Sequence, residues 1–432
     1  MVANTVLEIR NNNLCCSCGI CKNACPVGAI KYVREEGAFV PDLSDKCVSC
    51  GKCLSVCPSV CHNYSGDNFF DAIVGEYFDA YNVWSKDEKI RHFSASSGFV
   101  TTMVKELLNK REYEYVFTLD TYDYSTQLKT NKYDINSYNL DDISAQKFTK
   151  SRYLPVSHEN LVEYIIKNKE SKVIIIGTPC ALRGIDKVIK KFGLNRENYL
   201  FIGLFCEMVM NYNVYDYFSN SNFSDDKTLS SLHFKNKDSG GWPGNMKLFF
   251  SDGSFKYIDK DNRVNAKHFF ELERCLYCID KLNVVSDISV GDNYTSQNST
   301  SLGSNSVIIR TKRGEKAFKN IIDKIGCQKV DIKEILSSQY LSAKEINYNY
   351  SLLKKKTRGN NQLEINSNFS LNSLCDEYID SYKLSLKRIE YGKKYKGNIK
   401  PILKETKKIK SGHNFSFVSR LKRYIKRSII SK

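Results

Sequence analysis

Residues 15–26 read CCSCGICKNACP, and residues 47–58 read CVSCGKCLSVCP. In each stretch four cysteines follow the spacing C-x2-C-x2-C-x3-C, and a proline follows the last of them. Ten of the 16 cysteines of the chain lie between residues 15 and 61. Two matched runs of this kind indicate that the start of the chain is organised around thiolate chemistry.

This is the spacing of bacterial proteins with two [4Fe–4S] clusters, in which the last cysteine of each run binds the other cluster. A cubane needs one thiolate for each iron, and three closely spaced cysteines on a tight loop can reach three irons. Zinc needs only four ligands, so two matched runs ended by proline are a poor zinc pattern. The first predicted cluster is held by Cys15, Cys18, Cys21 and Cys57. The second is held by Cys47, Cys50, Cys53 and Cys25.

The residues around the two runs agree with this prediction. Gly19 and Gly51 occupy matching places, where the backbone must bend closely around a cluster. Residues 29–33 and 38–41 are expected to form two short strands. Cys16 and Cys61 fall outside the repeat, and we expect spare thiols there, although Cys16 could replace Cys15 in a damaged cluster.

Length and composition limit the remaining possibilities. The chain has 432 residues, 41% of them hydrophobic, which is enough for two or three domains with real cores. No apolar run approaches the roughly 18 to 20 residues of a spanning helix, and the start lacks the charged and apolar regions of a signal peptide. We therefore expect a cytoplasmic protein, in which dense cysteine indicates metal rather than disulfides.

The net charge of +17 is concentrated at the C-terminal end. Residues 383–432 contain 17 Lys and Arg against two Asp and Glu. Within this tail, residues 417–429 fit an amphipathic helix with basic side chains on one side. Such a helix is typical of contact with an anionic membrane surface. Docking on a partner, binding of RNA and the absence of a specific role stay as alternatives, although we expect no nucleic-acid partner.

The middle of the chain predicts an α/β body. The β-branched run Val173–Ile176 is expected to be a buried strand, residues 181–191 a helix, and Leu200–Leu204 a second strand. Cys180 and Cys206 lie at the carboxyl ends of these two strands. Because α/β sheets carry their sites at the carboxyl ends of the strands, these cysteines are candidate ligands.

A further pair, Cys275 and Cys278, stands in a C-x2-C pattern. Together with Cys180 and Cys206 it supplies the four thiolates of a third cubane. Cys327 and Cys375 lie in polar, helix-like segments and are expected to be ordinary side chains. Residues 246–250 and 254–258 flank Asp252-Gly253 and predict a hairpin.

Two smaller features leave alternatives open. The Ser-rich loop of residues 94–98 precedes a predicted helix over residues 99–109 and could bind an anion. An ordinary N-cap by Ser96 or Ser97 is the favoured interpretation. His233 could donate a proton or hold a phosphate, but a solvated surface histidine is favoured.

Several motifs in a fixed order resemble the family of coenzyme F420 (deazaflavin) hydrogenase and dehydrogenase beta subunits, in the form with an N-terminal two-cluster domain. The resemblance covers roughly residues 10 to 340. The motifs are Ser96-Ser97-Gly98, Ser151-Arg152-Tyr153, Gly177-Thr178-Pro179-Cys180, Gly203-Leu204-Phe205-Cys206, Cys275/Cys278 with Asp280, Asp287-Ile288 with Gly291-Asp292, and Gly303-Ser304-Asn305-Ser306.

The resemblance implies an iron–sulfur flavoprotein that binds FAD beside a [4Fe–4S] cluster. Carried over, the residues near the flavin are Ser96, Ser97, Gly98, Tyr153, Lys235 and Gly241. The expected function is a ferredoxin-linked, flavin-dependent oxidoreductase acting on a small organic substrate. The alternative is an electron-transfer subunit without its own substrate that serves a partner enzyme. Similar proteins occur in bacterial surface-polysaccharide gene sets, which makes polysaccharide biosynthesis a possible context. No residue stands out as a general acid or base.

The expected fold class is α+β, with a bacterial ferredoxin-like domain followed by an α/β flavin-binding body that has a smaller mixed-sheet part. We predict a two-cluster domain over residues 1–65 and a body divided into 66–225 and 226–345. A helical, basic tail is expected over 346–432. The expected partners are a redox protein, a small-molecule substrate and the inner face of the membrane.

Overall fold

The structure is a computed structural model that describes residues 4–60, 69–119, 133–134, 136–143, 150–220, 229–295, 300–358, 376–395, 398, 400–402 and 404. Cys61, the expected linker of residues 62–68, Cys375 and the amphipathic segment of residues 417–429 lie outside these described residues.

A two-stranded sheet forms the centre of the N-terminal part. Strand β1 (Ile30–Glu35) pairs antiparallel with β2 (Ala38–Leu43), in agreement with the two short strands predicted there. Three short helices surround the pair, α1 (Val6–Asn11), α2 (Ile20–Asn23) and α3 (Lys52–Ser55). Gly19 and Gly51 precede α2 and α3 with φ values of 75° and 72°. Both predicted bends therefore use the left-handed backbone that glycine adopts without strain.

An eight-stranded sheet dominates the body, with the order β15-β3-β14-β13-β9-β8-β4-β6. In chain order the strands are β3 (Asp79–Ser85), β4 (Tyr115–Thr118), β6 (Asn136–Tyr138), β8 (Val173–Gly177), β9 (Tyr199–Leu204), β13 (Ile288–Asp292), β14 (Asn305–Ile309) and β15 (Ile325–Lys329). These strands come from both sides of residue 225, and the proposed domain boundaries stay predictions.

The centre of this sheet is parallel, from β4 through β8 and β9 to β13. Strand β8, helix α9 (Pro179–Lys191) and strand β9 form the predicted βαβ unit. The helix begins with Pro179, whose missing N–H is no loss in a first turn. Cys180 and Cys206 therefore lie at the same edge of the sheet, just beyond the carboxyl ends of neighbouring strands.

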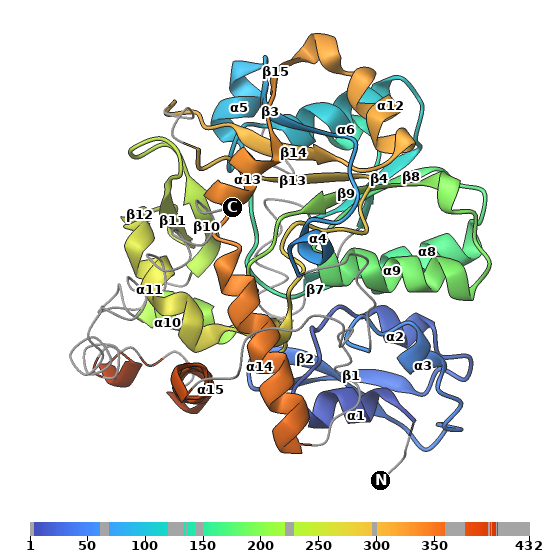
Figure 1. The fold of residues 1–432 in the computed structure, drawn as a ribbon, viewed down its shortest axis with the longest axis vertical. Coiled ribbons are helices and arrows are strands. Elements are labelled where there is room, and N and C mark those ends of the chain that lie inside the picture. Colours follow the sequence, from blue (N-terminus) through green and yellow to red (C-terminus); the bar gives the residue numbers. More distant parts are fainter. Residues whose placement is uncertain are drawn as a thin grey trace.

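Helices cover both faces of the large sheet (Figure 1). On one face, α6 (Phe99–Asn109) and α12 (Lys312–Lys319) share a core with the strands, and α6 has the bounds that its sequence predicts. On the other face, α8 (Glu159–Lys167) and α9 bury leucines and isoleucines against the sheet. The two-stranded N-terminal part packs beneath α8 and α9, so the molecule is built in layers.

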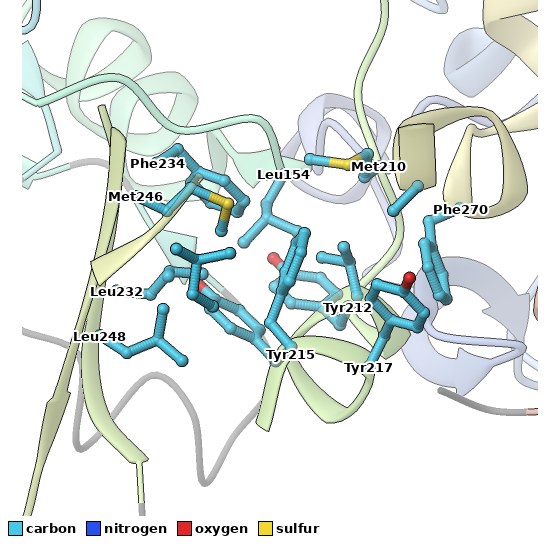
Figure 2. Close-up of a cluster of buried hydrophobic side chains, with 14 of the residues drawn as sticks. Leu154, Met210, Tyr212, Tyr215, Tyr217, Leu232, Phe234, Met246, Leu248 and Phe270 are labelled. Atoms are coloured by element: carbon cyan, nitrogen blue, oxygen red, sulfur yellow. The ribbon is translucent and has the colours of Figure 1, made fainter. Parts of the chain in front are cut away.

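A second, three-stranded sheet consists of β10 (Leu229–Asn236), β11 (Asn245–Phe250) and β12 (Phe255–Ile258). Helices α10 (Asn213–Asn220) and α11 (Lys260–Phe270) close its core, in which Tyr215, Phe234 and Met246 meet (Figure 2). All strand pairs in this sheet are antiparallel, so the prediction of a smaller mixed sheet was wrong. The strands follow one another through short loops, which permit only antiparallel pairing.

Two long helices complete the described part of the chain. Helix α14 (Ser342–Arg358) packs along the 3-10 turn Glu273–Tyr277, and α15 (Asp376–Tyr395) packs on α11 and α14. Tyr277, Tyr350 and Tyr382 meet between them. None of the helices in the described residues combines the length and apolar character that crossing a bilayer requires.

The remaining elements are small. They are the helices α4 (Phe69–Val74), α5 (Glu88–Phe93) and α13 (Ile332–Ser338), the strands β5 (Tyr133–Asp134) and β7 (Val156–Ser157), and the 3-10 turns Leu140–Asp142, Arg196–Asn198 and Ile322–Lys324. Cys327 lies in strand β15 and not in a helix as expected. This segment is a strand because it pairs with β3 at the edge of the sheet. The polarity of the local sequence does not predict such pairing.

Two glycines opposite each other in β8 and β9 offer a matched test of this packing. A Cβ on Gly203 would lie 2.4 Å from Asn283 and 2.6 Å from Ser286, whereas one on Gly177 would meet the flexible Leu182 side chain at 3.0 Å. We expect Gly203→Ala to lower the free energy of unfolding by about 1–3 kcal/mol, and Gly177→Ala to cost less. Anaerobic circular dichroism melts of both variants check this, and equal melting temperatures would contradict it.

Candidate redox site

Four cysteine thiols gather on the side of the N-terminal part that faces the body. They are Cys15, Cys18, Cys21 and Cys57, the set predicted for the first cluster, and each lies near others of the set. Burial raises the pKa of Cys15 to about 12, and the thiol of Cys57 adds a smaller increase. Thiols of this kind bind iron only by losing their protons, so cluster assembly releases protons.

The second predicted set also comes together within the N-terminal part. Its members Cys25, Cys47, Cys50 and Cys53 line one small cavity, together with the apolar side chains of Val27 and Val48. Cys50 is exposed, whereas the first set is at least half-buried. Of the two predicted clusters, the second is therefore the one nearer to solvent.

Helix α9 joins the first set to the body. Lys187 donates hydrogen bonds to the carbonyl oxygens of Cys57 (2.8 Å) and Val60 (3.0 Å). A Cβ on Gly184 would lie 2.5 Å from Ile20, so the helix and the N-terminal part are in close contact. At the start of α8, the backbone N–H of His158 donates to the Cys18 carbonyl oxygen at 2.8 Å.

The four body cysteines also come together. Cys180 is the second residue of α9, Cys206 follows β9, and Cys275 and Cys278 lie in and directly after the 3-10 turn Glu273–Tyr277. Burial raises the pKa of Cys206, and its neighbours Cys180 and Cys278 raise it further. The thiol of Cys275 also lies close to those of Cys206 and Cys278. Segments that are far apart in the sequence thus bring the four body thiols together in one group.

Polar side chains hold the Cys275–Cys278 turn in position. Asn347 of α14 donates to the carbonyl oxygens of Cys275 (3.0 Å) and Cys278 (2.9 Å), and Lys344 donates to that of Cys278 (3.1 Å). Both donors come from the segment around residue 346 at which we expected the tail to begin. The sequence alone gives no sign that this helix supports the cysteines.

A buried ion pair links the turn to α9. The Arg183 guanidinium lies 2.6 Å from the Asp280 carboxylate, and both side chains are at most 3% exposed. The other oxygen of Asp280 accepts from the backbone N–H groups of Asn283 (2.8 Å) and Val284 (3.3 Å). Asp280 therefore fixes the chain just after Cys278 relative to the helix that carries Cys180.

Among the described residues, no three His, Cys, Asp or Glu side chains converge closely enough to hold one metal ion. A cubane differs from a single ion because each thiolate binds a different iron, so its ligands stand further apart. The donor chemistry of the three groups, four thiols each, fits [4Fe–4S] clusters.

Cys16, expected to be a spare thiol, lies between the first set and the body cysteines. Its side chain is 7% exposed, and its thiol lies close enough to those of Cys18 and Cys180 to interact with both. The sequence carries no signal for this position, because the contact depends on how the N-terminal part packs on α9.

A cavity of about 430 Å³ opens beside these thiols, within the usual size range of ligand pockets. Cys16, Cys18, Cys180 and Cys206 contribute to its wall. Of the residues expected near the flavin, Ser96, Gly98, Tyr153 and Lys235 line it. Ser97 and Gly241 do not: Ser97 is buried against Asn305, and a Cβ on Gly241 would meet Ser301 at 2.9 Å.

The Ser-rich loop does not cap α6 as expected. The N-cap is Gly98, in a left-handed conformation with φ 79°. The Ser96 hydroxyl donates to the Ser304 carbonyl oxygen at 3.0 Å, and Ser97 bonds to Asn305. Both hydroxyls thus tie the loop to the start of β14, an interaction that the local sequence cannot predict.

The cavity wall is rich in cations. Lys150, Arg152, Lys235, Arg263 and Lys267 line it together with the acidic Glu207 and Asp292. Lys235 pairs with Asp292, which also accepts from the Tyr294 hydroxyl at 3.0 Å. Arg263 and Lys267 lie one turn apart on α11 and were not predicted as cavity residues, although their spacing places both on one helix face.

His233 is buried on β10, with 6% of its surface exposed, so the expected solvated histidine was wrong. Its ring packs edge-on against Phe249. Burial, together with the charges of Lys150, Arg152 and Lys247, lowers the pKa of His233 to about 3. The ring therefore stays neutral at physiological pH.

Two clusters in a small N-terminal domain, beside a thiol-lined cavity in an α/β body, are features of iron–sulfur electron-transfer proteins. Residues 7–58 match the profile of the 4Fe-4S dicluster domain, and residues 170–335 match the C terminus of the coenzyme F420 hydrogenase/dehydrogenase beta subunit. Residues 7–58 and 170–335 thus resemble a dicluster domain and the C terminus of this family of beta subunits, as the motifs predicted.

The chain is also similar to individual known proteins. The chain is 23% identical over 334 residues to the F subunit of F420H2 dehydrogenase from Methanosarcina mazei, covering 74% of this chain and 86% of the relative. It is also 23% identical over 345 residues to an uncharacterized protein of Methanocaldococcus jannaschii, covering 73% and 88%. A chain of the F420-reducing [NiFe] hydrogenase complex of Methanosarcina barkeri matches with 17% identity and a TM-score of 0.46, covering 64% and 94%.

Removing one partner of the buried ion pair tests its importance. We expect Asp280→Ala to lower the free energy of unfolding by about 3–5 kcal/mol, because it leaves Arg183 buried without its carboxylate. Glu315→Ala is the matched control, since it breaks the exposed pair with Lys319 and should cost less than about 1 kcal/mol. Urea unfolding without oxygen compares them, and equal losses would contradict the role of the pair.

The neutral His233 predicts a pH dependence of stability. Above its unfolded pKa of about 6.5 the ring is neutral in both states and has no effect. Below this pH the unfolded chain takes up a proton that the folded chain does not. Stability should then fall by about 1.4 kcal/mol per pH unit until the folded pKa near 3. Urea unfolding at pH 7.5 and 5.5 should show a smaller loss for His233→Gln, and an equal loss would contradict the assignment.

Proposed function

We propose that this protein is a ferredoxin-linked, flavin-dependent oxidoreductase. Electrons pass between the two clusters of the N-terminal domain, a third [4Fe–4S] cluster and FAD, to reduce or oxidise a small organic substrate. The observation that carries the proposal is the cavity wall, in which Cys180 and Cys206 lie alongside Ser96, Tyr153 and Lys235.

The order of the thiol groups supports a path through the molecule. The second set, with exposed Cys50, would receive electrons from a redox partner protein. The first set adjoins α9, and the third set borders the cavity through Cys180 and Cys206. Cys180 lies in the first turn of α9, so this helix fixes the position of its thiol relative to the first set.

The cavity residues fit a nucleotide-bearing cofactor. Basic side chains such as Lys150 and Arg263 suit the phosphates of FAD, and the flavin would convert one-electron transfer into two-electron chemistry. Lys235, held by Asp292 in the wall, supplies a fixed positive charge for an anionic ring or substrate. The coenzyme F420 after which the Methanosarcina mazei relative is named is one substrate of suitable chemistry.

Each proposed domain corresponds to one part of this function. They are residues 1–65 for the two clusters, 66–225 and 226–345 for the flavin-binding body, and 346–432 for the basic helical tail.

We propose a cytoplasmic location, with the tail as a contact to the inner face of the membrane. Flotation of the full chain with vesicles containing anionic lipid, compared with a chain ending at residue 390, distinguishes this contact from a tail without it.

A second candidate is an electron-transfer subunit that serves a separate enzyme, for example in surface-polysaccharide biosynthesis. The relative from Methanosarcina mazei is named as one subunit of a dehydrogenase, which favours this alternative. Full iron content without any flavin would support it.

Anaerobic purification with iron, sulfide and flavin quantified tests the proposal. We expect about twelve irons per chain, from three cubanes, and one FAD. Cys278→Ser should retain about eight irons and the flavin, and reduced ferredoxin should reduce that flavin more slowly. Cys327→Ser, which changes a cysteine of the edge strand β15, is the matched control and should retain twelve. Twelve irons in Cys278→Ser would contradict the third cluster.

A further inference from the structure

Two basic side chains of the body reach the part of the N-terminal domain around Cys57, which belongs to the first thiol set. The Lys187 ammonium of α9 donates to the carbonyl oxygen of Cys57 itself at 2.8 Å and to that of Val60 at 3.0 Å. The Arg274 guanidinium, which comes from a 3-10 turn of the body, donates through Nε to the Ser59 hydroxyl at 3.3 Å. Two separate elements of the body therefore place positive charge beside one predicted cluster ligand.

The contacts of Arg274 are shielded from water. Ser59 is 3% exposed, and its hydroxyl donates to the carbonyl oxygen of Leu14 at 2.6 Å, next to the ligand Cys15. The Nη1 atom of Arg274 is buried and has no hydrogen-bond partner among the residues that the structure describes. Charges that water and salt do not reach are screened weakly, so this guanidinium acts on its surroundings more strongly than an exposed surface charge.

Positive charge at this position favours one redox state over the other. A [4Fe–4S] cluster on four thiolates is an anion, and each added electron makes it more negative. A nearby cation therefore stabilises the reduced state more than the oxidised state and raises the reduction potential. The charge of an arginine is permanent in proteins, so this contribution does not depend on a proton.

We propose that Lys187 and Arg274 raise the reduction potential of the first cluster, which couples its redox state to the docking of the N-terminal domain on the body. The inference rests on the first cluster of the proposed function and needs neither the third cluster nor the flavin. Because such coupling is reciprocal, reduction of the first cluster should in turn tighten the docking. Both side chains act through their charge and bind no iron, so neither is a catalytic residue.

The coupling acts whenever the first cluster is reduced. When one electron passes from the second cluster to the first, iron of the second is oxidised and iron of the first is reduced, and no bond forms or breaks. The added negative charge then faces Lys187 and Arg274 across the interface. The backbone N–H of His158 crosses the same interface to the carbonyl oxygen of Cys18 at 2.8 Å, so this amide reports on how tightly the domain is held.

Anaerobic EPR-monitored redox titrations of the full chain with its clusters loaded test the inference. Lys187→Met and Arg274→Met should both lower the same midpoint, one that persists in Cys278→Ser. We expect the affinity for the electron to fall about tenfold in each variant, which corresponds to a shift of about 59 mV. Lys187→Arg and Arg274→Lys keep the charge and should leave this midpoint nearer to that of the unmodified chain.

The chain offers a matched control on the same helix. Lys191→Met removes the same charge from the last residue of α9, where the side chain is exposed and screened by water. We expect this variant to leave every midpoint unchanged. Iron content should equal that of the unmodified chain in all variants that keep the eight cysteines of the N-terminal domain and the four of the body.

Hydrogen exchange provides a second measurement. The amide of His158 should exchange more slowly in the chain reduced with dithionite than in the oxidised chain. The difference between the two states should become smaller in Lys187→Met. Equal exchange in both states of the unmodified chain would exclude the coupling to docking.

Other results overturn the inference in distinguishable ways. Unchanged midpoints in both methionine variants would exclude the two charges as a cause, and so would an equal shift in Lys191→Met. Charge-keeping variants that lower the midpoint as far as the methionine variants would do the same. Loss of four irons in both methionine variants would make Lys187 and Arg274 structural supports of the domain. About eight irons and no flavin in the unmodified chain would instead remove the proposed function, and the shift in Lys187→Met would still support this inference.

Discussion

The packing of the N-terminal domain on helix α9 is the constraint on which the redox account depends. Gly184 permits the close approach of Ile20, and Lys187 ties the helix to the carbonyl oxygens of Cys57 and Val60. The same helix begins with Cys180, so one rigid element faces the first thiol group with its side and the cavity with its N-terminal end. Electron transfer needs fixed separations, and a single helix that contacts both thiol groups would keep them fixed.

Much of this arrangement was accessible from sequence because it is local. The C-x2-C-x2-C-x3-C spacing determines which thiols can share a loop, and β1, β2, α6 and α9 formed where the patterns predicted. The βαβ unit brought Cys180 and Cys206 to one edge of the sheet for the same reason. These predictions depend on cysteine spacing and hydrophobic patterns between residues that are close in the sequence.

The features that sequence reasoning missed depend on contacts between distant segments. Asn347 reaches the Cys275–Cys278 turn from a helix that resembled the start of a tail, and Cys16 acquires its neighbours only when two domains meet. The burial of His233 and the strand conformation of Cys327 follow from sheet pairing, which has no local signature. The smaller sheet proved antiparallel because its strands are consecutive. Tertiary packing thus decided each of these positions.

An anomalous difference map recorded at the iron absorption edge, from crystals grown without oxygen, tests the central claim most directly. The account predicts three separate iron peaks, with the third between Cys180, Cys206, Cys275 and Cys278 beside the cavity. A map with iron only in the N-terminal domain would contradict it, since the chain of clusters would then end before it reached the body.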